Sequence, residues 1–167
     1  VFNYLSKDFQ QNIISSITDK EIKNIMDEIY FDDMIDLLEE MPAKVVKKIL
    51  IYSNVEERKL INQFLNYPED SAGSLMTIEY VDLKKNMTVS EAIERIKSTG
   101  IDKKSIYTCY VINEERKLEG TISLRKLILS NSKEKIENIM NKDVVFVNTH
   151  QDQEIIAGLF RKYDLIA

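Results

Sequence analysis

The chain has 167 residues, of which 44% are apolar and 31% charged, and its formal net charge is −5. This length is sufficient for one or two globular domains, and the mildly acidic balance excludes the basic composition that nucleic-acid binding requires. No run of about 18 apolar residues could cross a membrane, and the first residues do not follow the pattern of a leader peptide. We therefore expect a soluble protein.

The single cysteine and the single histidine do not suggest catalysis. Cys109 lies inside the apolar run 106–112, so we expect a buried strand residue in a reducing compartment and not a catalytic thiol. His150 has no second His or Cys nearby, which favours a turn residue over a zinc ligand. Without a nucleophile–base pair, a Gly-rich phosphate loop or a His-Glu-x-x-His pattern, the chain is not expected to be an enzyme.

Residues 1–66 contain an apolar pair that recurs every twelve residues: Ile13-Ile14, Ile25-Met26, Leu37-Leu38 and Ile49-Leu50, continued by Ile61. Helix-start residues keep the same period at Ser6, Thr18, Pro42 and Asn54, with Asp32 or Asp33 serving the middle unit. Helices of about nine residues are unstable alone and must pack on their neighbours. The pattern predicts a stacked helical repeat, with a single globular bundle as the alternative. Because residues 1–5 already fit, we expect earlier repeats before them.

Residues 24–43 form an acidic stretch with seven carboxylates and no Lys or Arg: Asp27, Glu28, Asp32, Asp33, Asp36, Glu39 and Glu40. Like charges three and four residues apart on a helix repel by a few tenths of a kcal/mol per pair. Two interpretations remain open from charge alone. The stretch is either a solvated acidic face or a surface that collects hard divalent cations through oxygen ligands.

Residues 67–167 contain a duplicated unit, whose two copies align at one constant offset without a gap. The matched positions include Leu75-Met76 with Ile139-Met140, Val81 with Val145, Ile96 with Phe160 and the N-cap residues Thr88 with Asp152. The first copy continues with strands at 106–112 and 118–123 around a turn, and with a helix at 124–130. This alternation predicts an α/β arrangement. The second copy stops at Ala167, before its own strand pair, so we expect the native protein to continue or a partner chain to cover the gap.

The run Tyr67-Pro-Glu-Asp-Ser-Ala-Gly-Ser-Leu-Met-Thr77, between the two repeats, closely resembles the junction signature of MgtE magnesium transporters. The duplicated unit is similar to the tandem CBS modules of that family, and the short helices resemble its N-terminal superhelical domain. This resemblance implies a multidomain fold of α and α/β type. We expect a helical domain at 1–66, a junction at 67–75, a first CBS unit at 76–135, and the start of a second, incomplete unit at 136–167.

The resemblance also implies a function, which is the sensing of magnesium by the cytosolic region of a magnesium channel. Regulatory, low-affinity Mg²⁺ would bridge acidic surfaces of the helical domain and the CBS pair and so close the gate. The metal ligands that it implies are Asp32, Asp33, the backbone at Gly73-Ser74, Glu154 and Asp164. Glu69 and Asp70 are weaker candidates and could instead cap the junction helix.

The implied partners are Mg²⁺, a second copy bound through the CBS modules, and the transmembrane pore of the same protein, which is absent from this sequence. The implied location is the cytoplasmic face of the bacterial cell membrane. No nucleic-acid partner is expected.

A nucleotide- or metabolite-binding CBS regulator is the alternative function, and a plain interaction scaffold is a third. CBS modules that bind adenosine nucleotides usually carry an Asp where this sequence has Lys126, in the run Gly120-Thr-Ile-Ser-Leu-Arg-Lys126. A lysine cannot accept hydrogen bonds from ribose hydroxyls. Nucleotide binding at the first unit is therefore in doubt, although Arg125 and Lys126 could still meet a phosphate.

Overall fold

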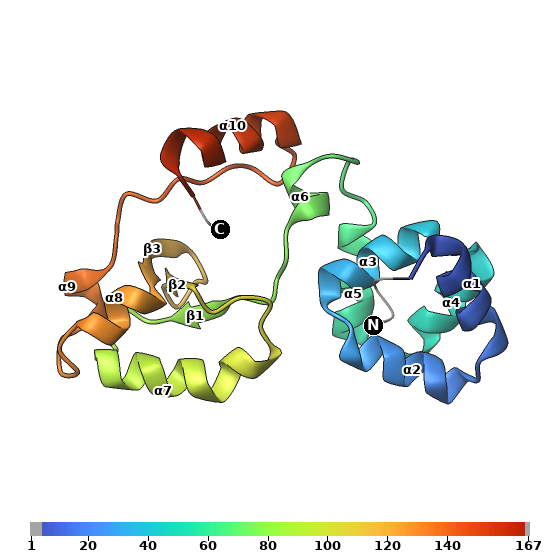
Figure 1. Ribbon diagram of the computed structural model, residues 1–167, viewed down its shortest axis with the longest axis horizontal. Coiled ribbons are helices and arrows are strands. Elements are labelled where there is room, and N and C mark those ends of the chain that lie inside the picture. Colours follow the sequence, from blue (N-terminus) through green and yellow to red (C-terminus); the bar gives the residue numbers. More distant parts are fainter. Residues whose placement is uncertain (1–4, 166–167) are drawn as a thin grey trace. The chain divides into compact units, whose positions relative to one another are not determined.

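A computed structural model describes residues 5–165 of the chain. The backbone divides into two compact units. The first consists of the chain up to Met76 together with Asn148–Gln153, and the second contains Thr77–Val147 and the residues from Glu154 onward (Figure 1). Residues 1–4, which we expected to belong to the helical repeat, lie outside the described residues.

The first unit contains five ten-residue helices whose first residues are spaced by twelve residues. They are α1 (Lys7–Ser16), α2 (Asp19–Glu28), α3 (Phe31–Glu40), α4 (Ala43–Tyr52) and α5 (Val55–Phe64). The repeated apolar positions supply the core, since Ile14, Leu37, Leu38, Ile49 and Ile61 are buried. The predicted helical repeat is therefore confirmed.

The N-cap positions keep the same spacing, and they are Ser6, Thr18, Tyr30, Pro42 and Asn54. Thr18 and Asn54 form capping boxes, in which each side chain accepts a hydrogen bond from a backbone N–H three residues later. The expectation for the middle helix was wrong. Tyr30 occupies the cap position without a side-chain hydrogen bond, and Asp32 and Asp33 lie in the first turn. Their negative charges stabilise the helix there through the helix dipole.

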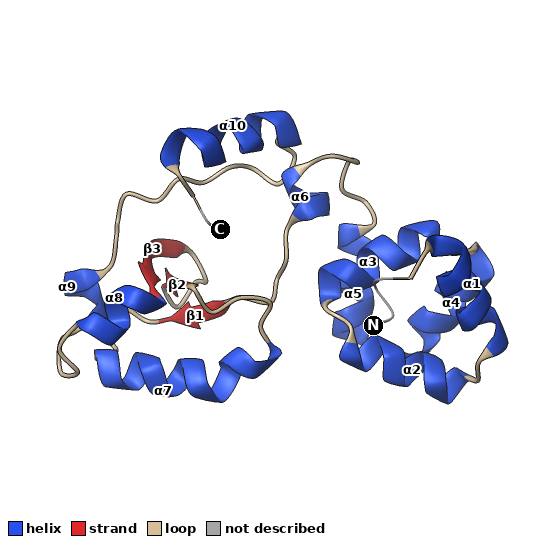
Figure 2. Ribbon diagram, in the orientation of Figure 1, coloured by secondary structure: helices blue, strands red, loops and turns tan. Residues whose placement is uncertain are grey.

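The second unit is built on a three-stranded sheet of order β1-β2-β3 (Figure 2). The strands are β1 (Val81–Leu83), β2 (Thr108–Ile112) and β3 (Leu118–Ser123). β1 pairs with β2 in parallel, and β2 pairs with β3 in antiparallel orientation. The helices of the repeated unit are α6 (Ala72–Leu75), α7 (Val89–Thr99), the 3-10 helix η2 (Gly100–Asp102), α8 (Leu124–Leu129), α9 (Ile136–Ile139) and α10 (Gln153–Tyr163).

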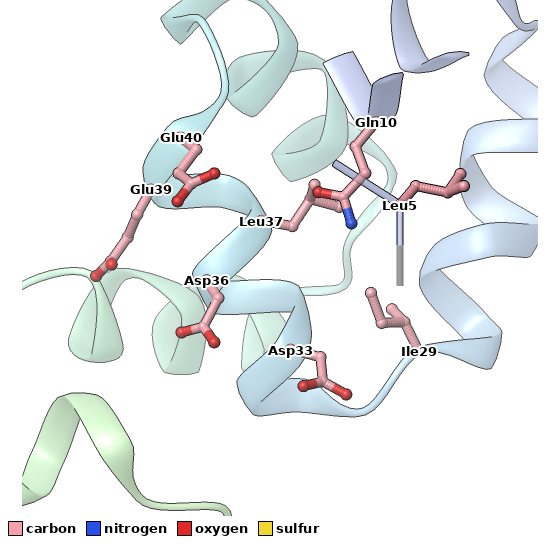
Figure 3. A pocket seen from close by; sticks show the side chains of 8 residues that line it. All are labelled: Leu5, Gln10, Ile29, Asp33, Asp36, Leu37, Glu39 and Glu40. Carbon is pink, nitrogen blue, oxygen red and sulfur yellow. The ribbon is translucent and has the colours of Figure 1, made fainter. Parts of the chain in front are cut away.

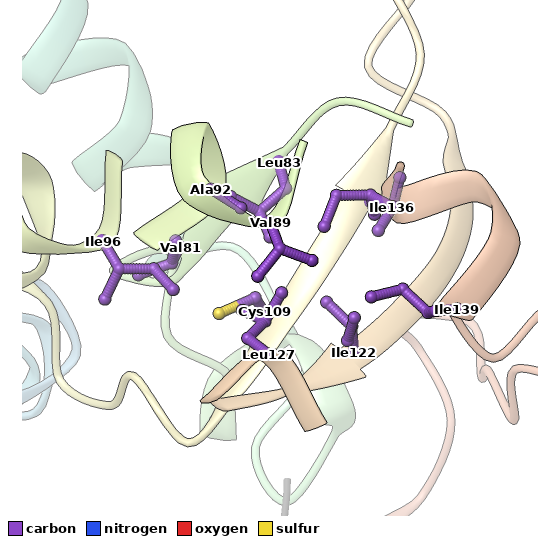
Figure 4. Packing of buried hydrophobic residues seen from close by; sticks show 11 residues of the cluster. Val81, Leu83, Val89, Ala92, Ile96, Cys109, Ile122, Leu127, Ile136 and Ile139 are labelled. Carbon is purple, nitrogen blue, oxygen red and sulfur yellow. The ribbon is translucent and has the colours of Figure 1, made fainter. Parts of the chain in front are cut away.

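The core of the second unit joins this sheet to α7, α8 and α9 (Figure 4). Its buried members are Val81, Leu83, Val89, Ala92, Ile96, Cys109, Val111, Ile122, Leu127, Ile136 and Ile139. Cys109 is fully buried in β2, and burial raises the pKa of its thiol to about 11. Because the thiolate is the reactive form, this environment is that of a structural cysteine.

The helices reproduce the duplication, since α9 begins at the position that matches the start of α6, and α10 at the position that matches the start of α7. The strand does not recur. Residues 145–147, which correspond to β1, form no strand in the structure. Pairing with β2 holds β1 in place, and the residues that would correspond to β2 at this offset are numbered beyond 167. The second repeat is therefore incomplete, as the sequence predicts.

Candidate functional site

A cavity of about 350 Å³ in the helical unit is bordered by the acidic helix α3 (Figure 3). The residues that line it are Leu5, Gln10, Ile29, Asp33, Asp36, Leu37, Glu39 and Glu40. Among these described lining residues there are four carboxylates and neither Lys nor Arg. The cavity therefore presents oxygen atoms and negative charge.

Helical periodicity explains why α3 presents its carboxylates along one side. Asp33 and Asp36 are three residues apart and Glu40 follows four residues later, so they lie on successive turns of one helix face. Figure 3 shows the acidic side chains following α3 from its first turn to its last. The helix is anchored by Ile35 and Leu38, which are 1% and 2% exposed, so packing fixes the positions from which the carboxylates project.

Electrostatics in this region disfavour an additional negative charge. Although Glu39 is exposed on the helix surface, partial desolvation of its carboxyl raises the pKa above its usual value, and the charges of Asp36 and Glu69 raise it further. Within the described residues, no three His, Cys, Asp or Glu side chains are grouped closely enough to hold a metal ion by themselves. Mg²⁺ is usually held in proteins by one or two carboxylates together with water.

Asp32 and Asp33, the predicted ligands on α3, are both half-buried in its first turn. Asp33 lines the cavity and Asp32 does not. Asp36 and Glu40, which follow Asp33 at helical spacings of three and then four residues, also line the cavity. They belong to the predicted acidic stretch but were not among the predicted ligands. The helical period alone could have identified them, because they share a face with Asp33.

Ser74, whose backbone is the predicted ligand at the junction, lies in α6. Its hydroxyl and its amide both form hydrogen bonds with Ser71. Its hydroxyl donates to the carbonyl oxygen of Ser71 at 3.0 Å, and its amide donates to the Ser71 hydroxyl at 3.3 Å. Ser71 is 2% exposed and is the N-cap of α6. The alternative that Glu69 or Asp70 caps this helix was therefore wrong.

Glu154 and Asp164, the predicted ligands in the second repeat, are not brought together. Glu154 is exposed in the first turn of α10, and Asp164 directly follows its last residue. At about 1.5 Å per residue the two positions are about 15 Å apart along the helix. Asp164 has a φ of 50°, a left-handed conformation that Asp tolerates better than most residues.

A second cavity of about 350 Å³ lies in the second unit against β2 and β3. Its polar lining residues are Thr108, Tyr110, Thr121, Ser123, Lys126, Asn141, Asp143 and Asp164. Within the described residues the Lys126 ammonium forms no hydrogen bond or ion pair. This cavity combines a cationic side chain with several hydrogen-bonding groups.

The chain resembles known proteins in its family models, in its sequence and in its structure. The model of the MgtE intracellular N domain matches residues 1–70, and the model of the CBS domain matches residues 72–131. The magnesium transporter MgtE of Bacillus subtilis is 35% identical over 163 residues, which are 98% of this chain and 36% of that protein. The magnesium transporter MgtE of Thermus thermophilus is 36% identical over 137 residues, or 80% of this chain and 30% of that protein.

Two solved structures resemble almost the whole chain. The cytosolic domain of the Mg²⁺ channel MgtE in complex with ATP has a TM-score of 0.90 and 32% identity, covering 99% of this chain and 68% of that one. The soluble part of a magnesium transporter has a TM-score of 0.92 and 30% identity, covering 99% and 65%. The chain thus spans about a third of the length of the two transporters. Among the described residues, no helix is both long and apolar enough to cross a membrane.

Proposed function

This chain belongs to the MgtE family of magnesium transporters, where it corresponds to the cytosolic region, and we propose that it senses Mg²⁺ and regulates a magnesium channel. Its place is the cytoplasmic face of the bacterial cell membrane. Its partners are the transmembrane pore of the same protein and a second copy bound through the CBS modules. We retain 1–66, 67–75, 76–135 and 136–167 as the domain boundaries.

The observation that carries this proposal is the cavity along α3, with four carboxylates and neither Lys nor Arg among its described lining residues. The raised pKa of Glu39 supports it, because it reflects partial desolvation of the carboxyl and the repulsion of Asp36 and Glu69. A divalent cation removes that repulsion without displacing the side chains. Mg²⁺ suits the site because it keeps most of its water and needs only one or two carboxylates from the protein.

The proposed gating mechanism adds acidic residues of the second repeat to those of the helical domain. At low Mg²⁺ the acidic surfaces of the helical domain and the CBS pair repel each other, and at high Mg²⁺ the bound ions bridge them and the gate closes. The proposed ligands are Asp32, Asp33, the backbone at Ser74, Glu154 and Asp164. Affinity is low because few ligands contribute, which lets the site titrate near the free Mg²⁺ concentration of the cell.

Small-angle X-ray scattering tests this mechanism directly. Mg²⁺ in the millimolar range should decrease the radius of gyration, while Na⁺ at matched ionic strength should not. Asp33→Asn and Asp164→Asn should each weaken the response. Glu56→Gln is the matched control, because Glu56 is an exposed carboxylate in the first turn of α5 and does not line the cavity. A radius of gyration unaffected by Mg²⁺ would contradict the mechanism.

A nucleotide is the second candidate ligand, and one observation favours it: the similar cytosolic domain was solved in complex with ATP. Lys126 lines the cavity against β2 and β3, and a phosphate is the group that its ammonium would bind, but the lysine cannot accept a hydrogen bond from a ribose. Calorimetric titration separates the candidates. Heat with ATP but none with Mg²⁺ alone would favour the nucleotide regulator, and indifference to both would favour a scaffold.

A further inference from the structure

The junction is attached to the turn that precedes α10. Ser71 and Asp152 form an isolated bridge. Three backbone hydrogen bonds flank it: Ala72 N–H to the Gln151 carbonyl at 2.8 Å, Gly73 N–H to the Thr149 carbonyl at 2.7 Å, and Gln153 N–H to the Asp70 carbonyl at 2.8 Å. We call this arrangement, between residues 70–73 and 149–153, the junction clamp. Because Gln153 is the first residue of α10, the clamp fixes the start of that helix.

The same arrangement occurs at the other end of the duplication, with every position displaced by the constant offset of the repeat. Thr88 bridges Lys135. The corresponding amide-to-carbonyl bonds are Ile136 to Met87 at 2.9 Å, Glu137 to Lys85 at 3.0 Å, and Val89 to Glu134 at 2.9 Å. The backbone pairing is therefore a property of the repeat, and what distinguishes the junction clamp must come from its side chains.

Tyr67 is the distinguishing side chain, and it contacts both halves of the junction clamp. Its ring lies directly against Gly73, where an added Cβ would be 2.5 Å from two ring carbons. Its hydroxyl accepts a hydrogen bond from Gln63 Nε2 at 2.8 Å. Its ring also meets the His150 ring edge to face, with centroids 5.9 Å apart. At the matching position of the other repeat the residue is Asn131, which has no ring.

The ring contacts continue from Tyr67 into the acidic helix. Tyr67 packs edge to face on Phe64 of α5 at 5.4 Å, and Phe64 packs edge to face on Phe31 at 5.0 Å. Phe31 is the first residue of α3 and directly precedes Asp32. Phe64 is 2% exposed, so close packing fixes this ring in the middle of the series. A continuous series of four rings thus connects the start of α3 to the turn before α10.

We propose that Tyr67 and His150 are positioning residues that couple the acidic face of α3 to α10. The clamp is the two-state element: it is closed when the four rings are in edge-to-face contact, and open when the turn 148–153 leaves the junction. A cation that orders the carboxylates of α3 also fixes the position of Phe31 and of the rings that pack on it in series. It therefore favours the closed clamp. This inference rests on the proposed function, since the cation is the one that α3 is proposed to bind.

Hydrogen exchange with and without Mg²⁺, measured on the 167-residue chain, tests the coupling at single amides. In the wild type, Mg²⁺ should slow exchange at Ala72, Gly73 and Gln153. In Tyr67→Leu these amides should exchange about tenfold faster or more and lose the Mg²⁺ effect, because the open clamp becomes populated. Tyr67→Phe keeps the ring and should restore the wild-type behaviour.

His150→Ala provides a second test that does not depend on the core, since His150 is exposed. It should abolish the Mg²⁺ effect at Ala72, Gly73 and Gln153 as well. The internal control is the matching pairing in the other repeat, where the amides of Val89, Ile136 and Glu137 should not change in any variant.

The possible results separate this inference from the proposed function. If Mg²⁺ changes no amide of the wild type, the sensor itself fails and the coupling fails with it. If Mg²⁺ slows exchange in α3 but the clamp amides of Tyr67→Leu and His150→Ala still respond as in the wild type, the coupling is overturned and Mg²⁺ sensing stands. Equal acceleration of the clamp amides and of the control amides in Tyr67→Leu would also overturn it.

Discussion

The substitution Gly73→Ala measures how closely the Tyr67 ring is packed. The new Cβ would lie 2.5 Å from Cγ and Cδ1 of Tyr67 and 2.8 Å from its Cδ2, whereas carbon atoms in favourable contact are about 3.5–4 Å apart. The ring must therefore leave its position. Overpacking costs about 1–3 kcal/mol, while replacing a helical glycine by alanine gains at most about 1 kcal/mol. We expect a net destabilisation of about 1–2 kcal/mol.

A double-mutant cycle with Tyr67→Ala isolates this contact. Without the ring, Gly73→Ala should be neutral or stabilising by up to about 1 kcal/mol, so the two substitutions should couple by about 1–3 kcal/mol. Urea unfolding, monitored by far-ultraviolet circular dichroism, gives the free energy of unfolding of each variant in the cycle. The transition to compare is the one that Tyr67→Ala shifts. Gly158→Ala is the control, because a Cβ at Gly158 meets no atom within 4 Å. An equal cost of Gly73→Ala in both backgrounds would refute the packing argument.

Three further predictions concern single sites. The pKa of Glu39 is raised in the folded state, so the protein loses stability as pH rises through that pKa and the carboxyl becomes charged. Glu39→Gln removes this charge, and it should therefore raise the melting temperature at pH 7 but not near pH 4. The buried Cys109 thiol, with its pKa of about 11, should not react with a thiol reagent at pH 8 until urea unfolds the protein. Asn54→Ala should cost about 1 kcal/mol in urea unfolding because it removes a capping box, whereas Ser6→Ala should cost almost nothing because Ser6 makes no side-chain cap bond.

The two internal repeats were predictable from sequence because they depend on local periodicity. Apolar pairs every twelve residues mark the buried face of each short helix, and the observed helices begin at that spacing. The constant offset between the two copies of the second repeat also predicted where α10 begins, because it matches the N-cap residue Thr88 with Asp152. The cap of α3 was not predictable by the same rule. Tyr30 has no short polar side chain that could reach the backbone, so the expected acceptor signal is missing at that position.

The candidate site was predictable only in part. Charge spacing identified the acidic stretch and included Asp33, but it could not show that Asp36 and Glu40 share a cavity with residues that precede α3 in the chain. The contact of Tyr67 with His150 joins positions far apart in the chain. No local pattern encodes such a contact, because it depends on how the repeats pair with each other.

Thermal unfolding during a Mg²⁺ titration tests the central claim most directly, because a ligand that binds only the folded state must stabilise it. Above the dissociation constant, each tenfold increase in Mg²⁺ should add about 1.4 kcal/mol per site. In a chain of this size that raises the melting temperature by about 3–5 °C. We expect Asp33→Asn to reduce this shift and Glu56→Gln to preserve it. A melting temperature that does not respond to Mg²⁺ beyond the effect of matched Na⁺ would contradict magnesium sensing by α3.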